Sequence, residues 1–197
     1  VSNNFVGSGL YVDRLEDKLK KYLNKKYCFV VNNGTNALLL ALESVKKKNF
    51  GKDEVIVSSY ICPAVINAIL QARLKPKFVD INNDDLNSNI EDIKLNINDK
   101  TLSIIIASVG GIGIYFQSLI QYGIPIIEDV CQSIGSEINN EVVGTMGDYT
   151  VMSFGSTKML TGGIGGAVLF NDNESYHIIK RLTRYESSTD FYLKEGF

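Results

Sequence analysis

The stretch Tyr27-Cys28-Phe29-Val30-Val31-Asn32-Asn33-Gly34-Thr35-Asn36-Ala37-Leu38 decides the fold class of this chain. Its first five residues are apolar and partly β-branched, which predicts a strand over residues 27–31. From Thr35 to Lys46 the apolar residues recur at helical spacing, which predicts a helix. Because helical residues follow the Asn-Gly pair directly, the sequence disfavours a hairpin turn there. A strand that leads straight into a helix is typical of a parallel α/β sheet.

The same alternation continues along the chain. Its spacing predicts strands over residues 54–57, 77–81, 102–107 and 124–127, and helices over 64–72, 90–97 and 115–121. Several of these strands are apolar on both faces, as in strands buried between two helical layers. Helical crossovers between them imply a mostly parallel, right-handed sheet. The sequence therefore predicts an α/β fold with three α/β/α layers.

The last third of the chain has a different pattern. Residues 137–143 predict a small hairpin with Asn139-Asn140 in its turn, and residues 173–184 predict a helix. Strands are predicted over residues 149–154 and 167–170, with a glycine-rich loop between them. Residues 185–197 show no clear period. A chain of 197 residues with no internal repeat or linker is suited to one domain.

Composition excludes several classes of protein. The formal charge of −2 gives no electrostatic basis for binding nucleic acid, and no apolar run is long enough to span a membrane. Three widely spaced cysteines, Cys28, Cys62 and Cys131, form no zinc or disulfide pattern, which indicates a reducing, cytoplasmic environment. With His177 as its one histidine, the sequence disfavours a histidine-based metal site or a catalytic triad.

The first candidate site residues follow the strand at 27–31. Gly34 lets the backbone approach an anion, and the first N–H groups of the helix together with the Thr35 hydroxyl can hold a phosphate. The alternative is an ordinary Asn-Gly turn in which Thr35 is the helix N-cap.

A second candidate group follows Pro125-Ile126-Ile127-Glu128-Asp129. A carboxylate at Asp129 can pair with a protonated pyridine nitrogen and so keep the ring an electron sink. The alternative is a helix cap or a surface acid. Gln132 is three residues further on and is within reach of the same ligand if the chain turns there.

The third candidate group is Ser153-Phe154-Gly155-Ser156-Thr157-Lys158. A Schiff-base lysine must be partly neutral, and burial beside a cationic ring favours that state. The alternative for Lys158 is an ordinary solvated lysine. Ser153 could donate to a phosphate from the end of its strand. An amine, a carboxylate and a phosphate cradle are what pyridoxal phosphate requires. The glycines of residues 162–166 precede a strand, so they do not form a dinucleotide fingerprint.

Taken together, residues 33–38, 128–133 and 153–158 resemble the DegT/DnrJ/EryC1/StrS family of pyridoxal-phosphate-dependent sugar aminotransferases. The similarity covers nearly the whole chain, because segments 53–57, 67–69, 76–81 and 162–166 also follow in the expected order. The resemblance implies the large domain of a fold-type I transferase, with a mostly parallel sheet between helix layers.

The resemblance also implies roles for single residues. Lys158 would bind the cofactor covalently and move the proton in the 1,3-shift, and Asp129 would pair with the pyridine nitrogen. Gln132 would lie near the hydroxyl side of the ring. Cys62 falls where an aromatic residue often stacks on the ring. The phosphate would be held by Gly34, Thr35 and Ser153.

The activity implied is transfer of an amino group, commonly from glutamate, to a nucleotide-linked keto sugar in polysaccharide, glycoprotein or antibiotic synthesis. A homodimer is expected, since active sites of the family lie between subunits. A related branch carries histidine in place of the lysine and dehydrates the sugar; Lys158 favours transamination. The alternatives are such a dehydratase and a non-catalytic remnant of the fold.

The sequence also departs from the family pattern. The resemblance implies that residues 1–197 are one cofactor-binding large domain, without the N-terminal extension and the small C-terminal domain of the family. The chain begins near the glycine segment Val6-Gly7-Ser8-Gly9 and ends at Gly196-Phe197, where the family continues. The loop at 108–114 is short and lacks the usual histidine-containing segment, which bears on the substrate side of the site.

Overall fold

The computed structural model describes residues 9–184, so the expectations for Val6–Ser8 and residues 185–197 lie outside the described part. The helices are α1 (Leu10–Tyr22), α2 (Gly34–Lys48), α3 (Pro63–Gln71), α4 (Ile90–Asn96) and α5 (Asn173–Arg184), with 3₁₀ turns η1 (Val109–Gly111) and η2 (Gln117–Tyr122). The strands of the main sheet are β1 (Tyr27–Val31), β2 (Glu54–Ser58), β3 (Lys75–Val79), β4 (Thr101–Ala107), β5 (Ile126–Asp129), β8 (Tyr149–Ser153) and β9 (Gly166–Phe170). The hairpin at 137–143 is confirmed as β6 (Glu137–Ile138) and β7 (Glu141–Val142).

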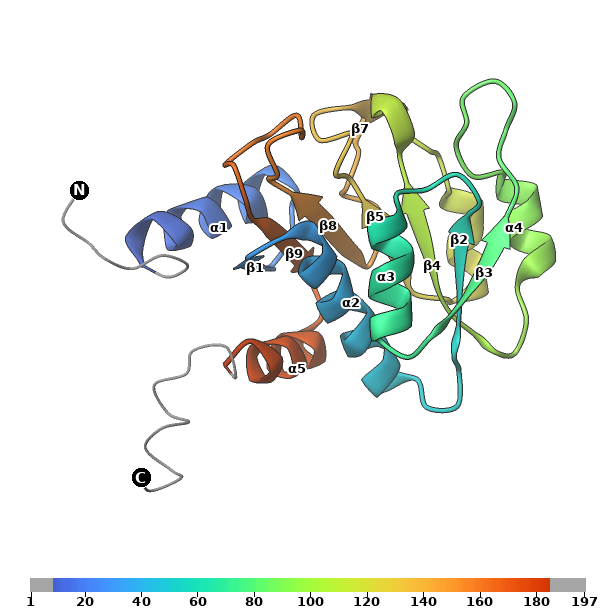
Figure 1. Cartoon of the computed structure of the whole chain (residues 1–197), viewed down its shortest axis with the longest axis horizontal. Coiled ribbons are helices and arrows are strands. Elements are labelled where there is room, and N and C mark those ends of the chain that lie inside the picture. Colours follow the sequence, from blue (N-terminus) through green and yellow to red (C-terminus); the bar gives the residue numbers. More distant parts are fainter. Residues whose placement is uncertain (1–8, 185–197) are drawn as a thin grey trace.

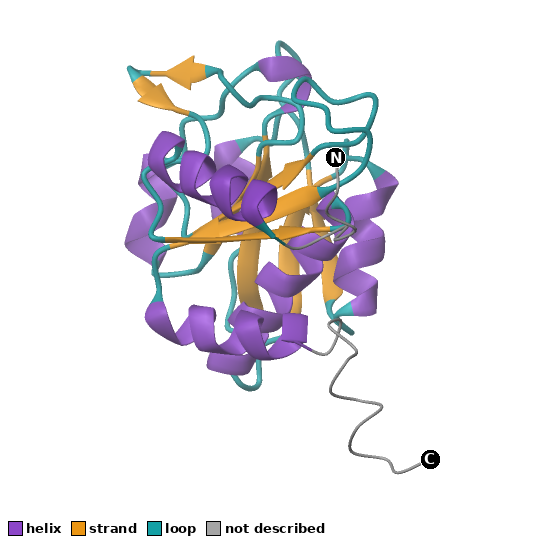
Figure 2. Cartoon of the chain, turned by 90° about the vertical axis from the view of Figure 1, so that its left-hand side faces the viewer, coloured by secondary structure: helices purple, strands orange, loops and turns teal. Residues whose placement is uncertain are grey.

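The sheet has seven strands in the order β1-β9-β8-β5-β4-β2-β3. Every pairing from β3 to β8 is parallel, whereas β9 runs antiparallel to both of its neighbours, β8 and β1. The mostly parallel sheet expected from the sequence is therefore confirmed, with one reversed strand inserted between β1 and β8. The β6-β7 hairpin lies apart from the main sheet (Figure 2).

Helices cover both faces of the sheet. On one face, α2, α3 and α5 pack on side chains such as Val57, Ile127 and Val168 (Figure 1). On the other face, α4 and η2 pack on the alternate residues of β4 and β5, and α1 packs on Met152 and Leu169. All seven residues of β4 are buried, as the two-sided apolar pattern predicted. This arrangement confirms the three-layer α/β/α architecture.

Within residues 9–184, none of the helices combines the length and the apolar character needed to cross a bilayer.

Three expected elements differ from the observed ones. The helix expected at 115–121 is the shorter 3₁₀ helix η2, which ends at Gly123 in the left-handed conformation and has no side-chain cap at Phe116. The strand expected at 77–81 is β3 at Lys75–Val79. Pro76 is tolerated inside β3 because this strand pairs only with β2 and is an edge strand. The strand expected at 124–127 is β5, so Asp129 is its last residue and does not follow it.

The N-cap of α2 is not Thr35, which was the cap in the alternative interpretation of the Asn-Gly turn. The N-cap is Asn33, whose Oδ1 accepts a hydrogen bond of 2.7 Å from the Asn36 N–H. Thr35 lies inside the first turn and is not the cap. The Asn33 backbone is extended, and its side chain accepts from the N–H three residues on, as an N-cap does. The Thr35 hydroxyl is consequently not engaged in capping this helix.

Candidate active site

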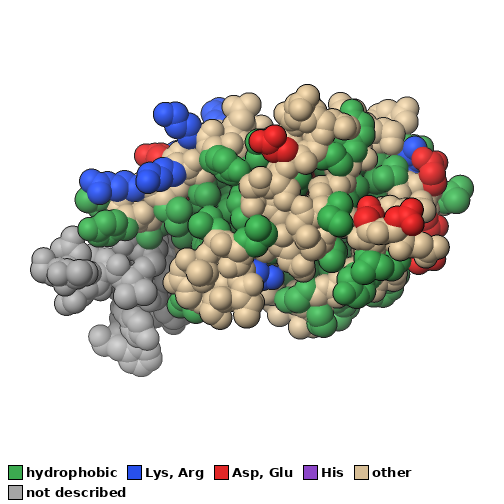
Figure 3. Space-filling model, turned by 90° about the horizontal axis from the view of Figure 1, so that it is seen from above, with side chains coloured by type: hydrophobic (Ala, Val, Ile, Leu, Met, Phe, Trp, Pro, Cys, Tyr) green, Lys and Arg blue, Asp and Glu red, His purple; other side chains and the backbone are tan. Residues whose placement is uncertain are grey.

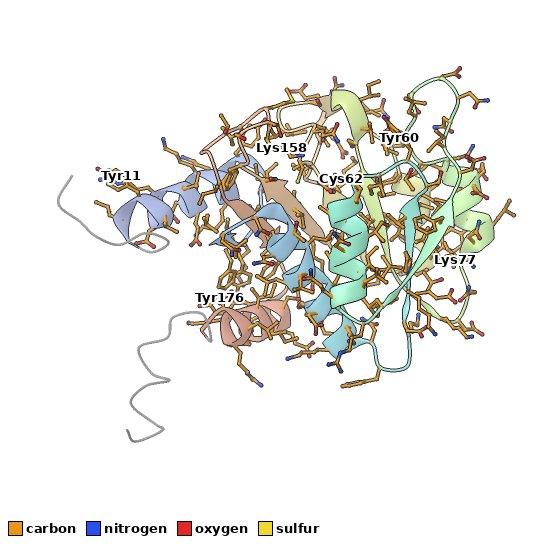
Figure 4. The ribbon with its side chains drawn as sticks, in the orientation of Figure 1. Tyr11, Tyr60, Cys62, Lys77, Lys158 and Tyr176 are labelled. Carbon is orange, nitrogen blue, oxygen red and sulfur yellow. The ribbon has the colours of Figure 1, made fainter. Side chains whose placement is uncertain are left out.

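One cavity lies at the carboxyl ends of the parallel strands, where ligands bind in open α/β sheets. Its volume is about 420 Å³, which is within the range of about 300–1,000 Å³ for small-molecule sites. Tyr60, Cys62 and Lys158 are at the same end of the molecule (Figure 4). All seven residues proposed from the sequence line this cavity: Gly34, Thr35, Cys62, Asp129, Gln132, Ser153 and Lys158.

The first turn of α2 forms one side of the cavity. Asn33 caps the helix, and the Asn36 side chain donates to Asn32 Oδ1 at 2.6 Å, which ties the turn together. The N–H groups of Gly34 and Thr35 belong to the first turn, which has no intrahelical acceptors for them. These donors and the positive end of the helix dipole favour an anion at this point.

Close approach requires glycine at Gly34. A Cβ atom there would lie 2.8 Å from the Ser153 Cβ atom and 3.3 Å from the Ser153 Oγ atom. The helix start is thus pressed against the end of β8, and the Ser153 hydroxyl is beside the free N–H groups. The N–H groups of Gly34 and Thr35 and the Ser153 hydroxyl together form one small polar concavity.

The contact between Gly34 and Ser153 depends on the absence of a side chain at Gly166. It is the first residue of β9 and pairs with Val31 on one side and Ser153 on the other. A Cβ atom at Gly166 would lie 2.5 Å from the carbonyl carbon and oxygen of Asn33 and 2.6 Å from the Gly34 nitrogen. The chain leaving β1 therefore crosses directly over Gly166 to reach Ser153 on β8.

Asp129 and Glu128 point to opposite sides of β5. One oxygen of Asp129, Oδ1, accepts a hydrogen bond of 3.0 Å from the Cys131 N–H, and the half-buried side chain lines the cavity. Glu128 is buried on the other face and accepts from the N–H groups of Gly144 and Gly147. Burial raises the pKa of Glu128, although these N–H groups oppose the shift. Only Asp129 is available to a ligand in the cavity.

Lys158 lies in the loop between β8 and β9. Its backbone N–H donates to the Gly155 carbonyl at 2.9 Å in a tight turn, and its half-buried side chain lines the cavity. The pKa of the nearby Cys131 thiol is affected by both Lys158 and Asp129. Burial raises the pKa of Cys131, the Asp129 carboxylate raises it further, and the Lys158 ammonium opposes this. The amine and the carboxylate thus face a common space.

Gln132 and Cys62 occupy two further walls. Gln132 Oε1 accepts a hydrogen bond of 3.3 Å from the Gly110 N–H in the loop after β4. Cys62 is exposed and is the N-cap residue of α3, followed by Pro63 at the first helical position. Seen from this end of the molecule, Lys and Arg side chains gather toward the side of α1, and uncharged side chains dominate the middle (Figure 3).

Other lining residues were not selected from the sequence. Tyr60 and Ser108 are the most polar of them, and both follow the carboxyl ends of parallel strands, β2 and β4. The rule that led to Asp129 would have found them if it had been applied to every strand. Within residues 9–184, His, Cys, Asp and Glu side chains form no group of three or more that could hold a metal ion.

Comparison with known proteins gives a consistent result. The chain matches the DegT/DnrJ/EryC1/StrS aminotransferase family over residues 1–196. It is 35% identical to a GDP-perosamine synthase of Vibrio cholerae, over 88% of this chain and 48% of that protein.

Two solved structures are similar in fold. Helicobacter pylori PseC, an aminotransferase involved in the biosynthesis of pseudoaminic acid, has a TM-score of 0.84 at 27% identity, over 90% of this chain and 49% of that one. E. coli GDP-4-keto-6-deoxy-D-mannose-3-dehydratase with bound hydrated PLP has a TM-score of 0.80 at 30% identity, over 87% of this chain and 46% of that one. The chain spans about half the length of the relatives it matches. With its fold-type I architecture and its match over residues 1–196, the chain belongs to the DegT/DnrJ/EryC1/StrS aminotransferase family.

Proposed function

We propose that this protein is a pyridoxal-phosphate-dependent aminotransferase that moves an amino group from an amino acid, glutamate, to a nucleotide-linked keto sugar. One observation carries the proposal: Lys158, Asp129 and the first turn of α2 line the same cavity. The name of the Vibrio cholerae relative, GDP-perosamine synthase, supports a nucleotide-linked sugar as the substrate class.

The residues present fit this cofactor. The concavity at Gly34, which a Cβ atom would fill, offers N–H groups and the Ser153 hydroxyl to a phosphate. Across the cavity, the half-buried Asp129 carboxylate lines the wall, with its Oδ1 atom held by the Cys131 N–H. We assign the phosphate to Gly34, Thr35 and Ser153 and the ring nitrogen to Asp129. Cys62 is assigned to the face of the ring and Gln132 to its hydroxyl side.

The chemistry then divides between cofactor and protein. When bound, the cofactor supplies an electron sink that makes a C–H bond beside the substrate nitrogen acidic. Asp129 would pair through its carboxylate with the protonated ring nitrogen and so maintain that sink. Lys158 Nζ would hold the cofactor covalently and would also move the proton of the 1,3-shift. Lys158 could serve in both roles, since it lines the same cavity as Asp129.

The dehydratase similarity supports a second candidate function. The E. coli relative at 30% identity is a sugar 3-dehydratase, so family membership alone does not choose between the reactions. The histidine of the dehydrating branch is replaced here by Lys158, and an amine can carry out the covalent step of transamination. Incubation of the full natural chain with glutamate and a GDP-linked keto sugar separates the two candidates. An amino sugar supports our proposal, and a deoxy sugar without nitrogen supports dehydration.

A direct test of the site uses covalent trapping. Borohydride treatment of the cofactor-loaded full chain, followed by peptide mapping, is expected to leave a pyridoxyl group on Lys158. The variant Lys158→Ala should lose this label, whereas Lys77→Ala, a lysine on the far edge strand β3, should keep it (Figure 4). A label on another lysine, or no label on a chain that binds the cofactor, contradicts the assignment. Absence of cofactor binding supports the non-catalytic remnant.

We extend the proposal to organisation and location. Residues 1–197 form one cofactor-binding domain of a cytoplasmic homodimer. The exposed apolar side chains of Met159 and Ile164, in the loop that carries Lys158, support a subunit contact beside the cavity. Light scattering on the full natural chain should give twice the monomer mass, and replacing both residues with Ser should shift it toward the monomer.

A further inference from the structure

We propose that Asn87 is a positioning residue of the cavity: it fastens the loop after β4 and, through that loop, orients the carboxamide of Gln132. Asn87 lines no part of the cavity itself, and nothing in the sequence motifs singled it out. The inference rests on the proposed function, because the cavity concerned is the one assigned above to the cofactor.

Both ends of the Asn87 side chain bind the loop. Its Oδ1 atom accepts a hydrogen bond of 2.8 Å from the Val109 N–H, 22 residues away, and its Nδ2 group donates to the Ile112 carbonyl at 3.2 Å. The residue is 1% exposed. Its own backbone is held as well, because its carbonyl accepts from the Asn82 N–H at 2.8 Å and its N–H donates to Asp85 Oδ1 at 2.9 Å. Asn87 is therefore a fixed point from which the loop is held.

The loop needs such a support. Gly110 and Gly111 have φ angles of 63° and 81°, and glycine has more conformational freedom to lose than any other residue. A backbone bond from the Ile112 N–H to the Val109 carbonyl, 3.1 Å, closes the turn, and Ser136 Oγ donates to the Gly111 carbonyl at 2.6 Å. The two Asn87 bonds span this turn from Val109 to Ile112. Removing them frees both ends of a segment in which Val109 lines the cavity.

The loop in turn determines which end of the Gln132 carboxamide faces the cavity. The Gly110 N–H group can only donate, so the Gln132 atom that meets it at 3.3 Å must be the acceptor Oε1. The NH₂ group of Gln132 is then the end left to a ligand. A cavity wall that presents an N–H donor selects a ligand with an acceptor oxygen at that position, such as a phenolate or hydroxyl oxygen. If the loop moves, the carboxamide loses the bond that fixes its orientation.

A double-mutant cycle tests the relay. The variants are Asn87→Ala, Gln132→Ala and the double variant in the full natural chain, and the measurement is the dissociation constant of pyridoxal phosphate from an absorbance titration. We expect Asn87→Ala to weaken binding about 5- to 10-fold in the wild-type background, and less than 2-fold when Gln132 is already Ala. If Asn87→Ala weakens cofactor binding by the same factor in both backgrounds, Asn87 acts only through general stability. That result would overturn the proposal that Asn87 orients Gln132. No change in the wild-type background overturns it as well.

Amide hydrogen exchange provides a readout that does not depend on the cofactor. Asn87→Ala should lower the protection of the Val109 and Gly110 amides, while the amides of β4 and β5 stay protected. Asn98→Ala is the matched control. Asn98 likewise accepts from a backbone N–H, that of Lys100, and donates to an oxygen, Glu54 Oε2, but at the opposite end of the sheet. If the wild-type chain fails to bind the cofactor, the proposed function is wrong. If amide exchange at Val109 and Gly110 is unchanged in Asn87→Ala, the positioning role of Asn87 is wrong, whatever the function.

Discussion

Replacement of Gly166 by alanine is the sharpest test of how the sheet builds the phosphate cradle. A methyl group there would lie 2.5 Å from the carbonyl carbon and oxygen of Asn33 and 2.6 Å from the Gly34 nitrogen. Gly166 has no left-handed φ angle, so close approach alone, and not backbone strain, requires glycine at this position. All three atoms belong to the backbone, which cannot swing aside as the tip of a side chain can.

The size of the effect follows from these distances. Ordinary carbon contacts are about 3.5–4.0 Å long, so the turn at Asn33 and Gly34 must move by about 1 Å. Overpacking of this kind costs about 1–3 kcal/mol of unfolding free energy. A displacement of about 1 Å in a positioning element can cost about 100-fold in function. We therefore expect Gly166→Ala to lose about 3 kcal/mol of stability and to bind pyridoxal phosphate at least 10-fold more weakly, with about 100-fold as the limit.

Two measurements on the same variants check this expectation. Urea unfolding should show a lower midpoint with an unchanged slope, and an absorbance titration should show the weaker cofactor binding. Gly162→Ala is the matched control in the preceding loop, where the nearest atoms to a Cβ would lie at 3.5 Å and 3.8 Å and the φ angle is ordinary. If Gly166→Ala is as stable as Gly162→Ala and binds the cofactor equally well, the crossing over β9 does not hold the cradle.

Two further predictions concern charged groups away from the cavity. Lys25 is buried and its Nζ donates to the Thr145 and Gly147 carbonyls, so Lys25→Met should lower the unfolding free energy by about 1–3 kcal/mol in urea titrations; an unchanged midpoint would show that these bonds contribute nothing net. Burial alone would raise the pKa of Asp172, but hydrogen bonds from Lys48 and Ser175 outweigh it and hold that pKa below the ordinary 3.8. The folded state thus binds fewer protons at Asp172, and its stabilisation is present above pH 3.8 and is lost as the pH falls further. In Asp172→Asn, the unfolding free energy should fall less steeply below pH 3.8 than in the wild type. An unchanged pH dependence in that range would refute this prediction.

Much of the fold was predictable because its elements have strong local periodicity. The helix α5 has the predicted bounds, 173–184, and the strands β1 and β4 were predicted to within one residue. The helix α1 was not predicted, although Leu15, Leu19 and Leu23 recur at helical spacing and pack in one cluster. Apolar periodicity applied to residues 10–22 could have found it. The 3₁₀ helix η2 was assigned as α-helical, since a run of six residues satisfies both patterns.

The candidate site was predictable to the extent that it follows from strand ends. A polar residue at the carboxyl end of a parallel strand tends to face a shared cleft, and by this rule Asp129, Ser153 and the Asn33–Thr35 turn were selected. Asn87 was not predictable, because it follows the edge strand β3 and acts on a loop 22 residues away. No local pattern marks a side chain whose role depends on which loop folds against it.

Apolar periodicity and glycine positions in the sequence determined where the chain is strand, helix or turn, because those preferences act over a few neighbouring residues. Only the tertiary structure decided the order of the strands and the insertion of β9, reversed, between β1 and β8. That order results from the packing of distant segments into common cores on the two faces of the sheet. It presses Asn33 against Gly166 and Gly34 against Ser153, and so unites residues more than a hundred positions apart in one cavity.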